Sequence, residues 1–382
     1  MTAADTATAA VDRSRGTLLD VSHFVHAHPE LGYEEFASAE CVAAAAAAAG
    51  LDVERGVAGL PTAFRATAGH GSLNIALCAE YDALPDVGHA CGHNIIAAAS
   101  LGAAIGLASV ADELDLTVTL LGTPSEEGGG GKIDLLAAGE FDLVHAALMV
   151  HPWPADFLTA RCLAVVHFNV TFEGRDAHAS AAPWEGVNAL DALTISQVAI
   201  ALLRQQLRPD DQVHGIVVEG GAAANIIPSR AVGRFMCRAA TAERLSELRR
   251  RVTACFEAGS LATGATLSID ELGHPFSHMD ADGDLVDHYR RVAESRGRRF
   301  DADFAAPTIS TDMANVSLAV PTIHPLLGFE TNGAVNHQPA FAAACVGDAA
   351  DAAVIDGAII LALTAIEVAG DGPLRERLVA RR

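Results

Sequence analysis

The stretch SLNIALCAEYDALPDVGHACGHN, residues 72–94, joins a buried strand to a cluster of reactive side chains. Its first half is a nearly continuous apolar run that ends at acidic residues, which is typical of a strand in a buried parallel sheet. Its last six residues hold two histidines and a cysteine. In an extended segment, Cys91 and His93 would point to the same side. The stretch therefore predicts an α/β fold with chemistry beyond the end of this strand.

Two further apolar runs, LDLTVTLLGTP (114–124) and AALMVHP (146–152), repeat this pattern. Each of the three predicted strands ends in polar residues, which are Glu80 and Asp82, then Glu126 and Glu127, then His151. In parallel α/β sheets, ligands bind beyond the carboxyl ends of the strands. We therefore expect these side chains to converge with Cys91 and His93.

The pattern changes near residue 163, where partly alternating strands and two long helical stretches begin. The expected order is β-α-β-β-α-β, which predicts a small split-βαβ (ferredoxin-like) domain inserted at residues 164–276. One of its helices is expected over residues 183–207, PWEGVNALDALTISQVAIALLRQQL. Residues 1–163 and 277–382 are expected to form one discontinuous, mostly parallel-sheet domain.

Composition narrows the range of functions. A chain of 382 residues is long enough for two domains. Its formal net charge of −23 would repel nucleic acid and anionic membranes, which argues against both as partners. Its seven cysteines are scattered, odd in number and without a C-x-x-C pair, so a reducing cytoplasm is expected. The uncharged run 95–111 is almost long enough to span a bilayer. Its content of Ala, Gly and Ser favours a buried helix.

Three interpretations of the cysteine and histidine cluster stay open at this point. It is half of a metal site, or a thiolate nucleophile at Cys91 with His93 or His89 as its base, or a buried coincidence. Metal-dependent hydrolases need several ligands and also a carboxylate that takes a proton from water. The adjacent pair Glu126 and Glu127 offers one residue for each role. The following GGGGK is no phosphate loop, because Lys132 is followed by Ile.

Eight motifs carry a resemblance that runs from about residue 20 to the C-terminus, and in chain order they are HPELGYEEFAS, AEYDALPDVGHACGHN, GTPSEEGGGGKIDLL, ALMVHP, GRDAHASAAPWEGVNALDA, GGAAANIIPSRA, STDMANVS and GAVNHQP. Together they resemble the zinc-dependent aminoacylase and carboxypeptidase metallopeptidase family. The likeness is greatest to its amidohydrolase branch, which includes hippurate hydrolases, auxin-conjugate hydrolases, N-acyl amino acid aminoacylases and p-aminobenzoyl-glutamate hydrolase.

The resemblance implies a role for particular residues. It implies two divalent metal ions, Zn²⁺ or Mn²⁺, with Glu126 as general base and Asp82 as the carboxylate that orients the site. His178 of the inserted domain, often supplied by a partner subunit, would reach the developing oxyanion. Asn225 and Arg238 would bind the carboxylate or carbonyl of the substrate. The implied metal ligands are Cys91, His93, Glu127, His151 and His337.

The resemblance also implies a function and an assembly. It implies hydrolysis of the amide bond of an N-acyl or N-aroyl amino acid or a dipeptide by metal-activated water. The inserted domain would act as a lid and dimerisation domain, in a homodimer or higher homo-oligomer. A hydrolytic deaminase or amidase of a small aromatic acid would use the same site. A cysteine hydrolase using Cys91 and a non-catalytic binding protein are alternatives of other classes.

One departure from the branch concerns the substrate. Many members have Asp after C-G-H, whereas this chain has Asn94. The Asn variant is typical of relatives of p-aminobenzoyl-glutamate hydrolase and of mammalian dipeptidases that release basic amino acids. It leaves the implied metal ligands intact, and it leaves the exact substrate open.

Overall fold

The computed structural model describes residues 1–300 and 306–381, and it divides into two compact units. The larger unit consists of Met1–Arg161 and Met279–Arg382, and the inserted unit is Cys162–His278. The expected insertion at 164–276 is two residues shorter than this at each end. Each unit has a hydrophobic core of its own.

The larger unit is built on a six-stranded sheet with the order β1-β2-β4-β3-β5-β13. The four strands β4, β3, β5 and β13 are parallel, and β2 and β1 continue the sheet in antiparallel fashion. The predicted mostly parallel sheet is thus confirmed. The strand bounds are β1 Asp52–Arg55, β2 Phe64–Ala68, β3 Leu73–Glu80, β4 Leu116–Thr123, β5 Ala146–Leu148 and β13 Thr322–Ile323.

Helices cover both faces of this sheet, because the strands are apolar on both sides. Ile75 and Leu77 of β3 belong to one core, and the alternate residues Ala76 and Cys78 belong to another. The first face is covered by α1 (Ala3–Arg13), α2 (Arg15–Ala27), α3 (Phe36–Ala48), α4 (His93–Ala108), α8 (Gly283–Ser295), α10 (Pro339–Ala344), α11 (Asp348–Gly370) and α12 (Gly372–Val379). The second face is covered by α5 (Gly131–Ala137) and α9 (Met313–Ala319).

The two most apolar helices lie inside the larger unit. Helix α4 is buried except at Ile105 and Ala108, so the expected buried helix within residues 95–111 is confirmed. It packs against α11, which also contacts α1 and α8. Helix α11 is long and apolar enough to cross a membrane, yet 72% of its most apolar window is buried inside the protein. Packing within the core accounts for its composition.

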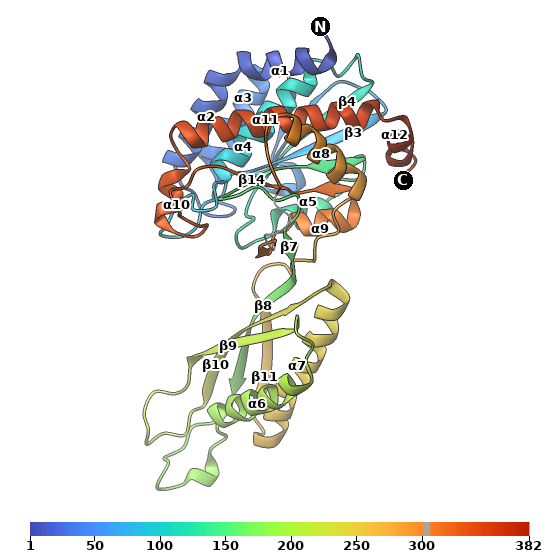
Figure 1. Ribbon diagram of the computed structural model, residues 1–382. Helices are drawn as coiled ribbons and strands as arrows, with labels where there is room; N and C mark the ends of the chain where they lie inside the picture. Colours follow the sequence, from blue (N-terminus) through green and yellow to red (C-terminus); the bar gives the residue numbers. More distant parts are fainter. Residues whose placement is uncertain (301–305, 382) are drawn as a thin grey trace. The chain divides into compact units, whose positions relative to one another are not determined.

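The inserted unit has the predicted split-βαβ topology. Its chain order is β8 (Ala164–Glu173), α6 (Ala189–Leu203), β9 (Gln212–Glu219), β10 (Arg230–Ala239), α7 (Ala242–Thr263) and β11 (Thr266–Glu271). The strands form an antiparallel sheet with the order β11-β8-β10-β9. Helices α6 and α7 pack against each other and against this sheet (Figure 1). One sheet face is therefore covered by helices, and β9 lies at an edge.

Two expectations about individual elements were wrong. The run 146–152 is not one strand, because the chain changes its pairing partner after β5, and β6 (His151–Trp153) pairs with β14 (Leu326–Gly328). The helix expected from residue 183 begins at Ala189. The side chain of Asn188 accepts hydrogen bonds from the N–H groups of Leu190 and Asp191, which caps the helix there.

The remaining short elements lie between these. They are the strands β7 (Arg161–Cys162) and β12 (Thr308–Ile309) and the 3₁₀ turns η1 (Val57–Gly59), η2 (Pro183–Glu185) and η3 (Arg204–Gln206).

Candidate metal centre

The loops after β3, β4 and β5, together with a C-terminal loop, bring possible metal ligands into one cluster. One group of ligand atoms within 4.8 Å of one another comes from Cys91, His93 and His151. A second such group comes from Cys91, Glu127 and His337. These two groups share Cys91, and a third group, His93, Glu126 and Glu127, shares one member with each of them. All five implied ligands lie in this cluster, and their role as ligands stays a prediction.

Asp82 holds two members of this cluster. It is buried, and its Oδ1 lies 3.0 Å from Nδ1 of His93, whose N–H donates to the carboxylate. Its Oδ2 accepts the backbone N–H of Glu127 at 2.9 Å. Nε2 of His93 is buried and has no hydrogen-bond partner among the described residues. An imidazole held through Nδ1 with an unpartnered Nε2 is the usual arrangement of a metal-binding histidine.

His151 is held in a similar way. Its Nδ1 donates to the carbonyl oxygen of Pro152 at 2.9 Å, which leaves Nε2 for the cluster. Burial lowers the pKa of His151 to about 3. The ring is therefore neutral at physiological pH, and neutral imidazole is the form that binds a metal ion.

The segment that carries Cys91 and His93 is not extended as expected. Cys91 lies in a turn, and His93 is the first residue of α4. Gly92 between them has φ of +77°, and a Cβ at this position would lie 2.5 Å from Cγ of Pro152. A left-handed glycine therefore redirects the chain here, and the two side chains converge through this turn.

The electrostatics of Cys91 bear on the cysteine-hydrolase alternative. Burial raises the pKa of its thiol well above the ordinary value. A nucleophilic cysteine needs a lowered pKa, which neighbouring positive charge provides. His93 acts to lower the pKa of this thiol and Glu127 acts to raise it, but burial outweighs the effect of His93, and His89 is not among the groups that act on the sulfur. This environment fits a metal-bound thiolate better than a free nucleophile.

Glu126 and Glu127 follow Ser125, whose backbone is left-handed with φ of +56°. This conformation costs a non-glycine residue about 1 to 2 kcal/mol, and it is found mainly where neighbouring structure enforces it. Nε2 of His93 lies 3.9 Å from a carboxylate oxygen of each glutamate. Burial, followed by the charges of Glu80 and Glu127, raises the pKa of Glu126 well above its ordinary value. A carboxylate that accepts a proton readily is suited to general-base catalysis.

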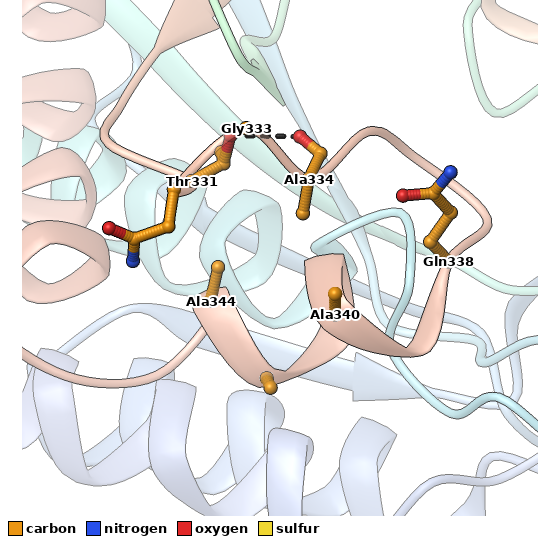
Figure 2. Close-up of a pocket in the computed structure, with 8 residues that line it drawn as sticks. Thr331, Gly333, Ala334, Gln338, Ala340 and Ala344 are labelled. Carbon is orange, nitrogen blue, oxygen red and sulfur yellow. Dashed lines mark hydrogen bonds between the residues drawn. The ribbon is translucent and has the colours of Figure 1, made fainter.

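His337 comes from the loop between β14 and α10. Its backbone is left-handed, with φ of +69°, and its N–H donates to the carbonyl oxygen of Ala90 at 2.9 Å. Nε2 lies 4.0 Å from Oε2 of Glu127, while the side chain is 63% exposed. The same loop, with α10, lines a pocket of about 370 Å³ (Figure 2). His337 therefore lies at the solvent-accessible rim of the cluster.

A buried ion cluster next to the candidate ligands was missed by the sequence analysis. Nζ of Lys132, the only lysine of the chain, lies 2.5 Å from Glu80 and 2.6 Å from Asp312. All three side chains are fully buried. The other oxygen of Glu80 lies 3.5 Å from Nε2 of His93. The uniqueness of Lys132 was the available signal, but its partner Asp312 lies 180 positions later.

His324 was also missed. It is buried, and its ring centroid lies 5.5 Å from that of His151. Burial lowers the pKa of His324 to about 4, so its ring is neutral. No local sequence pattern sets this histidine apart.

Asn94, the departure from the branch, has a structural role in this protein. Its amide nitrogen donates to Oγ of Ser22 in α2 and to the carbonyl oxygen of Cys345, each at 2.9 Å. It thereby connects the start of α4 to the N-terminal and C-terminal parts of the larger unit.

The three remaining predicted site residues lie on the inserted unit. Nδ1 of the exposed His178 accepts the N–H of Ser180 at 3.3 Å and that of Ala181 at 3.2 Å, so its ring proton is on Nε2. The N–H of Ala179 donates to the carbonyl oxygen of Asn225 at 3.0 Å, which brings these two segments together. Arg238 lies on β10, on the sheet face opposite the helices, because its neighbours Cys237 and Ala239 face the core.

Comparison with known proteins shows the family of this chain. Residues 76–355 match the model of peptidase family M20/M25/M40, which is more than two thirds of the chain. The chain belongs to this family. It is 38% identical over 379 residues to a Xaa-Arg dipeptidase of Mus musculus, covering 94% of this chain and 87% of that protein.

Two further comparisons concern a bacterial relative and the fold. The chain is 34% identical over 279 residues to one subunit of the p-aminobenzoyl-glutamate hydrolase of Escherichia coli, which covers 68% of this chain and 58% of that protein. Its structure is similar to that of a dinuclear metal binding peptidase of the family from Bacillus subtilis, with a TM-score of 0.72 and 20% identity, covering 94% and 99% of the chains. The predicted family and the predicted class, a metal-dependent hydrolase, are confirmed.

The buried ion cluster makes a prediction about stability. Lys132→Met should lower the free energy of unfolding by about 3 to 5 kcal/mol, because Glu80 and Asp312 would stay buried without their cation. Urea unfolding of the metal-free proteins measures this. The control Arg55→Met removes the exposed pair with Glu40 and should cost less than about 1 kcal/mol. Equal losses in both variants would show that the buried cluster has no special role.

Proposed function

We propose that the protein is a dipeptidase that hydrolyses the peptide bond before a C-terminal arginine or another basic residue. Hydrolysis is supported above all by the shared position of Cys91 in two groups of possible ligands. The substrate class is supported by the identity of 38% to the mouse Xaa-Arg dipeptidase over nearly the whole chain. A second candidate, an N-aroyl or N-acyl amino acid such as an aroyl-glutamate, is supported by the bacterial relative.

The proposed chemistry assigns each group one task. Two divalent ions, Zn²⁺ or Mn²⁺, would be held by the five clustered ligands and would supply Lewis-acid stabilisation and a lowered pKa of water. Glu126 takes a proton from the attacking water and returns it to the leaving amine. Asp82 keeps His93 and Glu127 in place.

The inserted unit supplies the substrate-facing groups in this proposal. The N–H at Nε2 of His178 stabilises the oxyanion that develops on the scissile carbonyl. Asn225 and Arg238 bind the carbonyl and the terminal carboxylate of the substrate. A guanidinium pairs well with a carboxylate, since it offers two parallel donors.

We also propose that the protein is a homodimer that assembles through the inserted unit. Strand β9 lies at the sheet edge and pairs with β10 alone among the described strands. Its residues Ile216, Val217 and Val218 are 45–62% exposed, and Val198 and Leu202 of α6 are also exposed. An apolar edge strand left uncovered is a site for pairing with another chain. Strand β9 of a second copy of the chain could pair with this edge and form hydrogen bonds with its unpaired backbone groups.

We place the enzyme in the cytoplasm. Six cysteines have free thiols, and four of these thiols are buried, which is consistent with a reducing compartment; they are Cys41, Cys78, Cys91, Cys237, Cys255 and Cys345.

A substrate panel tests the proposed activity. With added Zn²⁺ or Mn²⁺, dipeptides with C-terminal Arg should be cleaved faster than aroyl-glutamates, N-acyl amino acids and amides of small aromatic acids. EDTA should abolish the activity, and iodoacetamide on the metal-loaded enzyme should not. Faster cleavage of aroyl-glutamates would favour the second candidate. Activity that survives EDTA and is lost with iodoacetamide would contradict the metal-dependent mechanism.

The two adjacent glutamates should be separable by mutation. Glu126→Gln should keep both metal ions but lose about 10²- to 10⁴-fold in rate, because the proton acceptor is removed. Glu127→Gln and Cys91→Ser should instead lose metal, as measured by elemental analysis. If the phenotypes of the two glutamate variants are exchanged, the roles are reversed. Near-normal turnover in both would exclude these residues from catalysis.

Mixing two inactive variants tests whether His178 acts across the dimer. His178→Ala alone should lose about 10²- to 10³-fold in rate without losing metal, because an oxyanion donor is removed. If His178 acts on the partner's site, a hybrid dimer with Glu126→Gln has one site with both groups intact, so activity returns on mixing. If His178 acts in its own chain, every hybrid site lacks one group. Persistent inactivity after proven subunit exchange would refute the arrangement in trans.

A further inference from the structure

A short N-terminal segment, Gly32–Glu35, lies directly against the turn that carries Glu126. Glu35 is fully buried, and its Oε1 accepts the backbone N–H of Ser125 at 2.8 Å. Ser125 is the residue with the left-handed backbone, immediately before Glu126. A carboxylate from a distant part of the chain therefore holds the backbone of Ser125. The position of Ser125 in turn determines where the next residue, Glu126, lies.

The same segment contacts the turn at two more points. Gly32 lies so close that a Cβ there would be 2.2 Å from Oγ of Ser125. The ring of Tyr33 lies so close to Gly129 that a Cβ at Gly129 would be 2.2 Å from Cε2. The Tyr33 hydroxyl donates to Oδ2 of Asp134 at 2.6 Å. One side of the turn and the start of the helix after it are thus in contact with these residues.

The turn itself is closed by its own backbone. The N–H groups of Gly129 and Gly130 both donate to the carbonyl oxygen of Ser125, at 3.1 and 2.7 Å. The peptide groups of Ser125 are therefore bonded on both sides, to Glu35 through the N–H and to the turn through the carbonyl. A shift at Ser125 would therefore displace Glu126, the residue that follows it.

We propose that Gly32, Tyr33 and Glu35 form a clamp that positions the general base Glu126, with Glu35 as a positioning residue. The proposal rests on the proposed function, since it assumes that Glu126 takes the proton. Glu127 has a further anchor, because its N–H donates to Asp82. Loss of the clamp should therefore displace Glu126 and leave the metal ligand Glu127 in place.

Three variants test the clamp by steady-state kinetics and metal analysis. Glu35→Leu should lower kcat by about 10- to 100-fold, because small displacements of a catalytic group have effects of this size. KM and metal content should stay near the wild-type values. Glu35→Gln should retain most of kcat, since its amide oxygen can accept the N–H of Ser125. Glu34→Leu, at the exposed neighbouring position, is the matched control and should resemble the wild type.

Hydrogen exchange gives a readout that needs no substrate. Peptides covering residues 123–131 should exchange faster in Glu35→Leu than in Glu35→Gln or Glu34→Leu. Gly32→Ala should show the same increase, because its Cβ would displace Ser125, and it provides a second variant if Glu35→Leu does not fold. If the wild type cleaves nothing in the panel, the proposed function fails while this measurement still tests the clamp.

Two results would overturn the proposal. One is unchanged exchange of residues 123–131 and unchanged kcat in a folded Glu35→Leu protein. The other is a loss of metal in Glu35→Leu that parallels the loss of kcat, because Glu35 would then support the ligands and not Glu126.

Discussion

The two hydrogen bonds of the Asp82 carboxylate are the constraint on which the rest of the site depends. One orients the ring of His93 from the start of α4, and the other fixes the backbone of Glu127 after β4. Asp82 follows β3, so a single buried side chain connects the loops of two neighbouring parallel strands. Both partners of Asp82 are candidate ligands. They follow neighbouring strands of the sheet, so the distance between these strands sets the spacing of the two ligands. The ligand cluster is thus a consequence of strand order, not of the loops alone.

Burying so many acids in one place requires compensating charge. Glu80, Asp82, Glu126 and Asp312 are all buried near the cluster, and Lys132 is the lysine that lies among them. Burial acts to lower the pKa of His93, but Asp82 outweighs it and holds that pKa well above the ordinary value. Lys132, which lies between Glu80 and Asp312, therefore offsets part of the negative charge.

Metal binding replaces protons in such a site. Burial raises the pKa of the Cys91 thiol, and Asp82 raises the pKa of His93 against the effect of burial, so both shifts favour the protonated side chains. In the proposed metal site, affinity would therefore rise with pH, because thiolate and neutral imidazole are the forms that bind a metal ion. The positive charge of the ions would then stand where the protons had been.

Features that follow from local pattern could be predicted from the sequence, and features that depend on distant pairing could not. Apolar runs predicted β3 and β4, alternation predicted the split-βαβ order, and the motifs predicted the clustered ligands. The pairing of Lys132 with Asp312 and of Glu35 with Ser125 joins residues 180 and 90 positions apart. Hydrophobic periodicity carries no information about such pairs. Even the local prediction for Cys91 and His93 was wrong in its backbone, because Gly92 adopts a left-handed conformation.

The two units differ in how they prepare their functional groups. In the larger unit, long-range contacts hold the candidate ligands and Glu126, so their geometry depends on the complete fold. In the inserted unit, His178 is prepared locally, since the amides of Ser180 and Ala181 fix its tautomer within three residues. The orientation of this ring is therefore set by residues next to it in the chain. In the proposed dimer, this local orientation would let His178 act as a donor at a site on the partner chain, because the orientation requires nothing from that site.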